Sequence, residues 1–149
     1  DLAEVWGCAV HPTEQIFATS GADMCVRLWQ ESKMVAVSQQ LPFDATAVDW
    51  SSCGKFLAVG DRNGDCTIMD AKNLQVLGSS KSTLSGKKVA WVEDIKWSPD
   101  STRIAFGSHG GNSKLNFVTV NAQGKPTKSE HSKVAISSAL ICLDWSQDG

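Results

Sequence analysis

Hydrophobic residues in this chain gather into short runs that alternate with turn-forming residues. Three runs are apolar at nearly every position: IFATSG (16–21), FLAVG (56–60) and IAFGS (104–108). Each follows a turn rich in Ser, Pro, Gly or Asp. Runs of this length that are closed by Gly are typical of strands covered on both faces. The 3.6-residue apolar spacing of an amphipathic helix is missing from the sequence, which therefore predicts an all-β fold.

A second turn and a second strand-like segment follow each run. The turns are GADM, DRNGD and HGGN, and the segments are CVRLW (25–29), CTIMD (66–70) and KLNFVTV (114–120). The dipeptide Asn63-Gly64 tolerates positive φ and predicts a two-residue hairpin loop in the second of these turns. A more polar stretch closes each unit, so each unit is expected to form four short antiparallel strands.

The units repeat along the chain. Trp50, Trp97 and Trp145 end near-identical segments that recur 47 and 48 residues apart, and Val10 occupies the same place 40 residues before Trp50. A lone four-stranded sheet cannot keep water from both of its apolar faces, so the units must stack. Four strands in a period of 40 to 48 residues indicate the blades of a β-propeller.

The WD40 type of propeller is favoured because Trp29 ends the segment VRLWQ six residues after the turn residue Asp23. We expect a WD40-type β-propeller fragment with three four-stranded antiparallel blades and the first strand of a fourth. The approximate blades are 5–41, 45–80 and 91–130, and the fourth begins in 131–149.

Three blades and a fragment cannot close a ring, since four to eight blades are usual. The chain also begins at Asp1 without a Met. We therefore expect it to be part of a longer protein, with the rest of the fourth blade beyond Gly149. Open blade faces predict that the piece self-associates.

Composition narrows the possible partners. The net charge is −2 and the pI is about 5.9, which argues against a nucleic-acid partner. The five cysteines form no C-x-x-C pair and no N-x-[ST] acceptor is present, which indicates reduced thiols in an intracellular protein. The longest apolar stretch, 139–143, is far too short for a membrane span.

Signals for catalysis or cofactor binding are weak. The histidines His11, His109 and His131 share no ligand spacing with the cysteines. The segment DRNGD (61–65) lacks the Glu of a calcium loop, and SKSTLSGKK (80–88) does not follow the order of a phosphate-binding loop. We predict no catalytic residues, no metal, no cofactor and no enzymatic activity.

Two kinds of residue are candidates for partner binding. Trp6 and Trp91 lie outside the register of the repeated tryptophans, which are predicted to wedge between blades. Trp6 and Trp91 are therefore either structural residues or anchors for a partner. The loops that enter and leave the third unit are rich in lysine. These lysines either are solvated or face an acidic partner. They are Lys81, Lys87 and Lys88 in the loop that enters the unit, and Lys125, Lys128 and Lys133 in the loop that leaves it.

Four segments in the same order resemble the echinoderm microtubule-associated protein-like family. They are VWGCAVHPTEQIFATSGADMCVRLW (5–29), GKFLAVGDRNGDCTIMDAKNLQVL (54–77), AFGSHGGNSKLNFVTV (105–120) and HS…LICLDWSQDG (131–149). The resemblance implies part of a pair of fused propellers that bind tubulin, in the cytoplasm and on the cytoskeleton. The alternative is a WD40 scaffold of an unrelated protein complex.

WD40 repeats are often buttressed by a polar network of a loop His, a Ser or Thr, a turn Asp and a Trp. The first unit offers Thr19 or Ser20, together with Asp23 and Trp29. The second unit has Asn63 and Met69 at the Asp and Trp positions, and His131 resembles the loop His of the fourth unit. Because no unit holds all four, blade identity depends on the apolar pattern.

Overall fold

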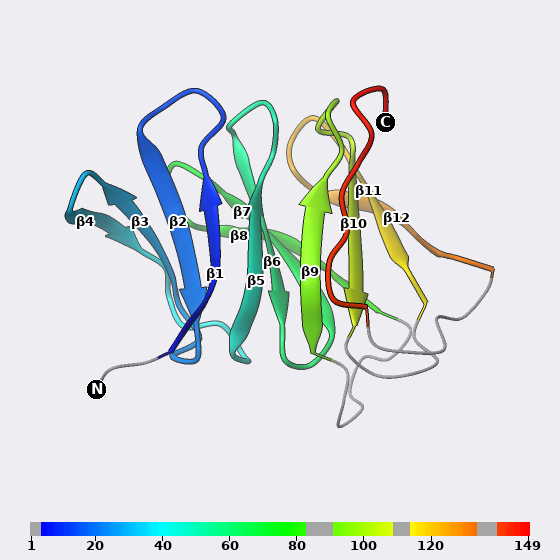
Figure 1. The fold of residues 1–149 in the computed structure, drawn as a ribbon, viewed down its shortest axis with the longest axis horizontal. Helices are drawn as coiled ribbons and strands as arrows, with labels where there is room; N and C mark the ends of the chain where they lie inside the picture. The colour runs from blue at the N-terminus through cyan, green and yellow to red at the C-terminus, as the bar shows by residue number, and fades with distance from the viewer. Residues whose placement is uncertain (1–3, 83–90, 109–113, 134–139) are drawn as a thin grey trace.

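The computed structural model describes residues 4–82, 91–108, 114–133 and 140–149. Its strands form three antiparallel four-stranded sheets, in which each strand pairs with its neighbours in sequence (Figure 1). The first sheet contains β1 (Val5–Val10), β2 (Ile16–Gly21), β3 (Val26–Gln30) and β4 (Lys33–Val37). The second contains β5 (Ala45–Trp50), β6 (Phe56–Asp61), β7 (Asp65–Asp70) and β8 (Val76–Lys81). The third contains β9 (Val92–Trp97), β10 (Arg103–Ser108), β11 (Asn116–Val120) and β12 (Pro126–His131).

The predicted all-β architecture is confirmed, since the described residues form strands and turns and contain no helix. It follows that no described helix is long and apolar enough to cross a membrane. The three sheets stack like adjacent propeller blades, with β1 against β5 and β5 against β9 (Figure 1). The outer strands β4 and β12 are largely exposed, whereas every residue of β6 is buried.

The middle sheet buries both of its faces, as expected for a blade between two others. Val48 and Trp50 of β5 pack in a cluster with residues of the first sheet such as Leu28. Ala47 of β5 and Ile68 of β7 belong to a second cluster that contains the core of the third sheet. Because neighbouring side chains of a strand point to opposite faces, one strand supplies both clusters.

Carboxylates of the innermost strands β5 and β9 bond to the backbone of the segment that follows in the stack, which is β9 for the first and residues 140–149 for the second. Asp49 Oδ2 accepts a hydrogen bond of 2.8 Å from the backbone N–H of Trp97, and Asp94 Oδ2 accepts one of 2.9 Å from Leu143. Burial raises the pKa of the Asp49 carboxyl. These bonds satisfy inner-edge N–H groups that no neighbouring strand can reach.

Close packing between blades depends on glycine at one repeated position. A Cβ on Gly60 would lie 2.4 Å from Cγ1 of Val92, and a Cβ on Gly107 would lie 2.6 Å from Cδ1 of Leu140. Gly60 pairs with Ala47 and Gly107 pairs with Asp94 at the same point of the β5–β6 and β9–β10 ladders. The second and third sheets thus each receive a side chain from the segment that packs against them, Val92 of β9 and Leu140 of residues 140–149, at a position that has no side chain of its own.

Residues 140–149 lie against the third sheet but form no strand (Figure 1). Trp145 Nε1 donates a hydrogen bond of 3.0 Å to the Lys96 carbonyl. Trp50 Nε1 likewise donates one of 3.1 Å to the Ala9 carbonyl, so each indole bonds to the strand about one repeat before it in the sequence. The segment therefore occupies the place predicted for the first strand of a fourth blade. A strand needs a hydrogen-bonded neighbour, and no described segment lies in the sheet beside it.

The outer face of the first sheet is open. Val10 is 70% exposed, whereas Trp50 and Trp97, at the same position of the next two sheets, are 7% and 5% exposed. Phe17 and Trp29 stack on one another on this sheet, with ring centroids 6.2 Å apart. The second and third sheets bury the corresponding face, which carries Trp50 and Trp97, whereas the first sheet leaves its aromatic and aliphatic face exposed.

The turn between β6 and β7 differs from the prediction. Three residues, 62–64, separate the two strands, and only Gly64 has positive φ, at 86°. The predicted two-residue loop required positive φ at both Asn63 and Gly64. A longer loop with one left-handed Gly forms instead because Asp61 Oδ1 accepts the N–H groups of Asn63 and Asp65, both at 2.9 Å.

Candidate functional site

Three consecutive blades bring aromatic and charged side chains together on one rim. Trp6 lies near the start of β1, Arg62 in the β6–β7 turn, and Trp91 directly before β9. The Arg62 guanidinium carbon lies 5.8 Å from the ring centroid of Trp6 and 5.3 Å from that of Trp91. Arg62 also forms an ion pair of 3.1 Å with Asp44. Both tryptophans therefore contact the same cation, although 85 residues separate them.

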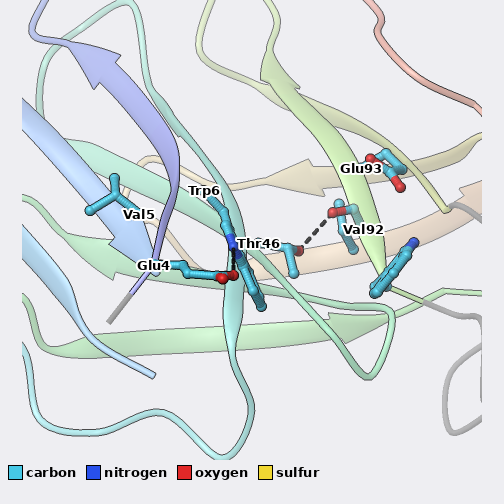
Figure 2. A pocket seen from close by; sticks show the side chains of 7 residues that line it. Glu4, Val5, Trp6, Thr46, Val92 and Glu93 are labelled. Carbon is cyan, nitrogen blue, oxygen red and sulfur yellow. Dashed lines mark hydrogen bonds between the residues drawn. The ribbon is translucent and has the colours of Figure 1, made fainter. Parts of the chain in front are cut away.

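A pocket of about 580 Å³ opens at this rim (Figure 2). Its lining comes from the starts of the innermost strands and consists of Glu4, Val5, Trp6, Thr46, Trp91, Val92 and Glu93. Figure 2 shows Glu4 and Trp6 on one side of Thr46, and Val92 and Glu93 on the other. We call this site the rim pocket.

Hydrogen bonds hold the walls of the rim pocket. Trp6 Nε1 donates to Glu4 Oε2 at 2.9 Å, which orients both side chains. Thr46 Oγ1 lies 2.6 Å from the Val92 carbonyl and 3.2 Å from the Gly60 carbonyl, so its hydroxyl connects the second blade to the third. The pocket is therefore a product of blade stacking and is not formed by any one repeat.

The β6–β7 turn positions Arg62 through a buried carboxylate. Asp61 is 5% exposed, and its two hydrogen bonds from backbone N–H groups hold the turn that carries Arg62. Burial raises the pKa of Asp61 to about 6, and the nearby Asp65 carboxylate adds to the rise. Burial in the same turn region also raises the pKa of the Cys66 thiol. Arg62 thus extends from a turn with fixed geometry.

The sequence singled out Trp6 and Trp91 because they lie outside the tryptophan register, and the structure brings both to the rim pocket. Sequence reasoning missed Arg62 and Glu4. Arg62 is part of DRNGD, which was judged only as a turn or a calcium loop, and Glu4 precedes the first strand. The available signal was the position of these residues at the ends of strands that share one rim.

Four of the six predicted lysines are described, and they lie in or beside the outer strands β8 and β12, which contact one another through Ser80 and Ser129 (2.7 Å). Lys81 ends β8, whereas Lys125 precedes β12 and Lys128 lies within it, ion-paired at 2.7 Å to Glu130. The placement of Lys125 and Lys128 in a loop that leaves the third unit was wrong, because residues 126–131 are the outermost strand of that unit. Lys133 follows β12. Lys87 and Lys88 lie outside the described residues.

The first sheet contains one link of the predicted polar network. Trp29 Nε1 donates to Thr19 Oγ1 at 2.8 Å. Asp23 instead pairs with Arg27, which lowers the pKa of the Asp23 carboxyl. Ser20 is buried, and its hydroxyl has no hydrogen-bond partner among the described residues. His131 ends β12 opposite Asn116 and is exposed.

Within the described part of the chain, no three His, Cys, Asp or Glu side chains gather as metal ligands do. The side chains that line the rim pocket are aromatic, aliphatic, hydroxyl and carboxylate groups. Aromatic and arginine side chains dominate the energetics of protein interfaces, and Trp6 is 38% exposed at the pocket wall.

Comparisons with known proteins agree with the stacked sheets. The family described as "Anaphase-promoting complex subunit 4 WD40 domain" matches residues 12–93, and "WD domain, G-beta repeat" matches residues 78–115. Among solved structures, Saccharomyces cerevisiae Sqt1 superposes with a TM-score of 0.75 at 16% identity. This similarity covers 91% of the chain and 37% of Sqt1 and shows the fold.

Similar curated proteins are microtubule-associated by name. The chain is 29% identical to human echinoderm microtubule-associated protein-like 3 over 98% of its length, which is 16% of that protein. It is 31% identical to mouse echinoderm microtubule-associated protein-like 2 over 99% of its length, which is 22% of that protein. The 77 kDa echinoderm microtubule-associated protein of Strongylocentrotus purpuratus is 25% identical over 97% of the chain.

The chain spans about a sixth to a fifth of the length of these relatives. The family match covers more than half of the chain, and the three stacked sheets have the four-stranded antiparallel form of propeller blades. The chain therefore belongs to the WD40-repeat family of β-propeller domains and is homologous to the echinoderm microtubule-associated protein-like proteins.

Proposed function

We propose that the chain is a non-catalytic interaction module and forms part of a propeller that binds tubulin on the cytoplasmic cytoskeleton. The observation that carries this proposal is sequence similarity over 97–99% of the chain to proteins named for microtubule association. Propellers present rims and loops to partners from a rigid scaffold. A WD40 scaffold of an unrelated complex has the same fold, so the partner must be tested directly.

The rim pocket and the neighbouring Arg62 are the proposed contact surface. Arg62 has a side chain that is 52% exposed, and it lies beside the partly exposed Trp6. Three blades contribute to this surface, so it is present only where the sheets are stacked. Lys81, the last residue of β8, and Lys133, which follows β12, are the described lysines we propose to face an acidic tubulin surface.

Co-pelleting of the full-length protein with polymerised tubulin tests the proposal. We expect the protein to pellet with microtubules, and the Trp6→Ala and Arg62→Ala variants to pellet less. Val76→Ala is the matched control, because Val76 is also exposed but lies on the outer strand β8. Equal pelleting of parent, variants and control would remove the rim from the proposal, and the absence of pelleting of the parent would favour the unrelated scaffold.

The lysines are tested separately, because charge contacts weaken as salt rises. Charge reversal at Lys87 and Lys88 together should reduce pelleting at low salt and have little effect at high salt. The same comparison applies to Lys81→Glu. If none of these variants changes pelleting at low salt, these lysines are not contact residues for tubulin.

A further inference from the structure

We propose that the rim pocket binds a basic side chain, a lysine or arginine of a protein partner, against the indoles of Trp6 and Trp91 and next to the carboxylate of Glu4. This inference concerns the chemistry of the partner's contacting residue. It does not require that the partner is tubulin.

The aromatic walls favour a cation. A guanidinium or ammonium group within about 6 Å of an indole centroid is attracted by the negative face of the ring. Arg62, which does not line the pocket, lies 5.8 and 5.3 Å from the two centroids, so each ring already takes part in one cation–π contact outside the pocket. Tryptophan is the strongest of the aromatic side chains in this role.

The charges at the pocket also favour a cation. The two ionisable side chains that line it are Glu4 and Glu93, and no lysine or arginine is among the described lining residues. Arg62 does not line the pocket, and its charge is balanced in part by Asp44 at 3.1 Å. A carboxylate can accept about four hydrogen bonds, and Glu4 uses one for Trp6 in a bond that fixes its direction.

The size and the apolar lining suit a long side chain with a charged end. A volume of about 580 Å³ is within the usual range for ligand pockets and holds a lysine or arginine with part of its backbone. Val5 and Val92 are lining residues that can contact the methylene stem. An acidic side chain would be repelled by the Glu4 carboxylate, and a purely apolar one would displace water from that carboxylate while leaving it only the hydrogen bond from Trp6.

The test uses the whole chain and the blocked amino acids N-acetyl-lysine methylamide and N-acetyl-arginine methylamide as probes. N-acetyl-norleucine methylamide, which has the stem without the charge, and the blocked glutamate are the comparison probes. Binding is followed by NMR through the indole N–H signals of the six tryptophans. The variants Trp6→Phe and Trp91→Phe assign the two signals of interest.

We expect saturable shifts of the Trp6 and Trp91 signals with the two basic probes. The norleucine probe should bind about fivefold more weakly, because it lacks the cation–π and ionic contributions. Glu4→Gln should weaken the lysine probe by a similar factor. Glu14→Gln, at an exposed acidic residue of the β1–β2 turn outside this pocket, should leave binding unchanged.

Three outcomes would overturn the inference. They are equal affinity for lysine and norleucine probes, tighter binding of the glutamate probe, and shifts that Glu4→Gln does not change. Circular dichroism of Glu4→Gln shows whether the variant is folded, and an unperturbed spectrum of the other four indole signals shows that the blades remain stacked. The probe-binding test does not use microtubules, so this inference and the proposed function can fail independently.

Discussion

Replacement of Gly60 by alanine should disrupt the contact between the second and third blades. The new Cβ would lie 2.4 Å from Cγ1 and 2.6 Å from Cβ of Val92, where carbon atoms in contact are normally about 3.5–4.0 Å apart. The backbone at Gly60 is held on both sides by β5 and β7, so Val92 and β9 must move instead. Overpacking of this kind costs about 1–3 kcal/mol.

The complementary change, Val92→Ala, removes two methyl groups from a side chain that is 1% exposed. Loss of transfer free energy is about 1.6 kcal/mol at 0.8 kcal/mol per methyl, and the cavity adds to it, for a total of about 2–3 kcal/mol. In the double variant the contact of 2.4 Å with Cγ1 is gone, but Cβ of residue 92 stays 2.6 Å from the new methyl, so the clash is only partly relieved. The double variant should therefore be more stable than the sum of the two single effects predicts, by about 1 kcal/mol.

Urea unfolding of the parent, the two single variants and the double variant, followed by circular dichroism, measures this coupling. Val118→Ala combined with Gly60→Ala is the control, because Val118 is buried in the same cluster but is not among the atoms nearest to Gly60. Its effect should be additive with that of Gly60→Ala. Additive effects for Gly60 and Val92 as well would refute the close approach of the two blades at this point.

Three further predictions follow from buried groups and open faces. Because burial raises the folded-state pKa of Asp61 to about 6, from an ordinary 3.8, the folded protein binds this proton more tightly, and its free energy of unfolding should fall as pH rises from about 4 to 6. Asp61→Asn keeps an acceptor oxygen without the charge, so it should remove this pH dependence and unfold at a higher urea concentration than the parent at pH 8. If the free energies of unfolding of variant and parent change in parallel with pH, the reasoning is contradicted. Trp50→Phe should cost about 1 kcal/mol more in urea unfolding than Trp97→Phe, since the indole of Trp50 bonds to a carbonyl and that of Trp97 has no described partner. Light scattering should give a mass above 16.0 kDa that rises with concentration and falls towards the monomer in Val10→Lys, whereas a stable monomer at all concentrations would show that the open first face does not pair.

The strands and their stacking could be predicted from the sequence because both depend on local and periodic patterns. The runs 16–21, 56–60 and 104–108 coincide with β2, β6 and β10. An apolar run with no polar alternation can be satisfied only by cover on both faces, and a repeat of such runs supplies that cover. The turn of 61–65 was predicted less well, because its length depends on hydrogen bonds of the Asp61 side chain.

The sequence by itself determined a chain of stacked four-stranded blades, since the repeat of apolar runs and turn residues is local and can be recognised without the structure. The tertiary structure alone decided which residues share a rim. Trp6, Arg62 and Trp91 come from three repeats and meet only because the starts of β1 and β9 and the β6–β7 turn lie at the same end of the stacked sheets. No local pattern records this meeting, because the distances between blades are set by contacts such as Gly60 with Val92 that join residues far apart in sequence.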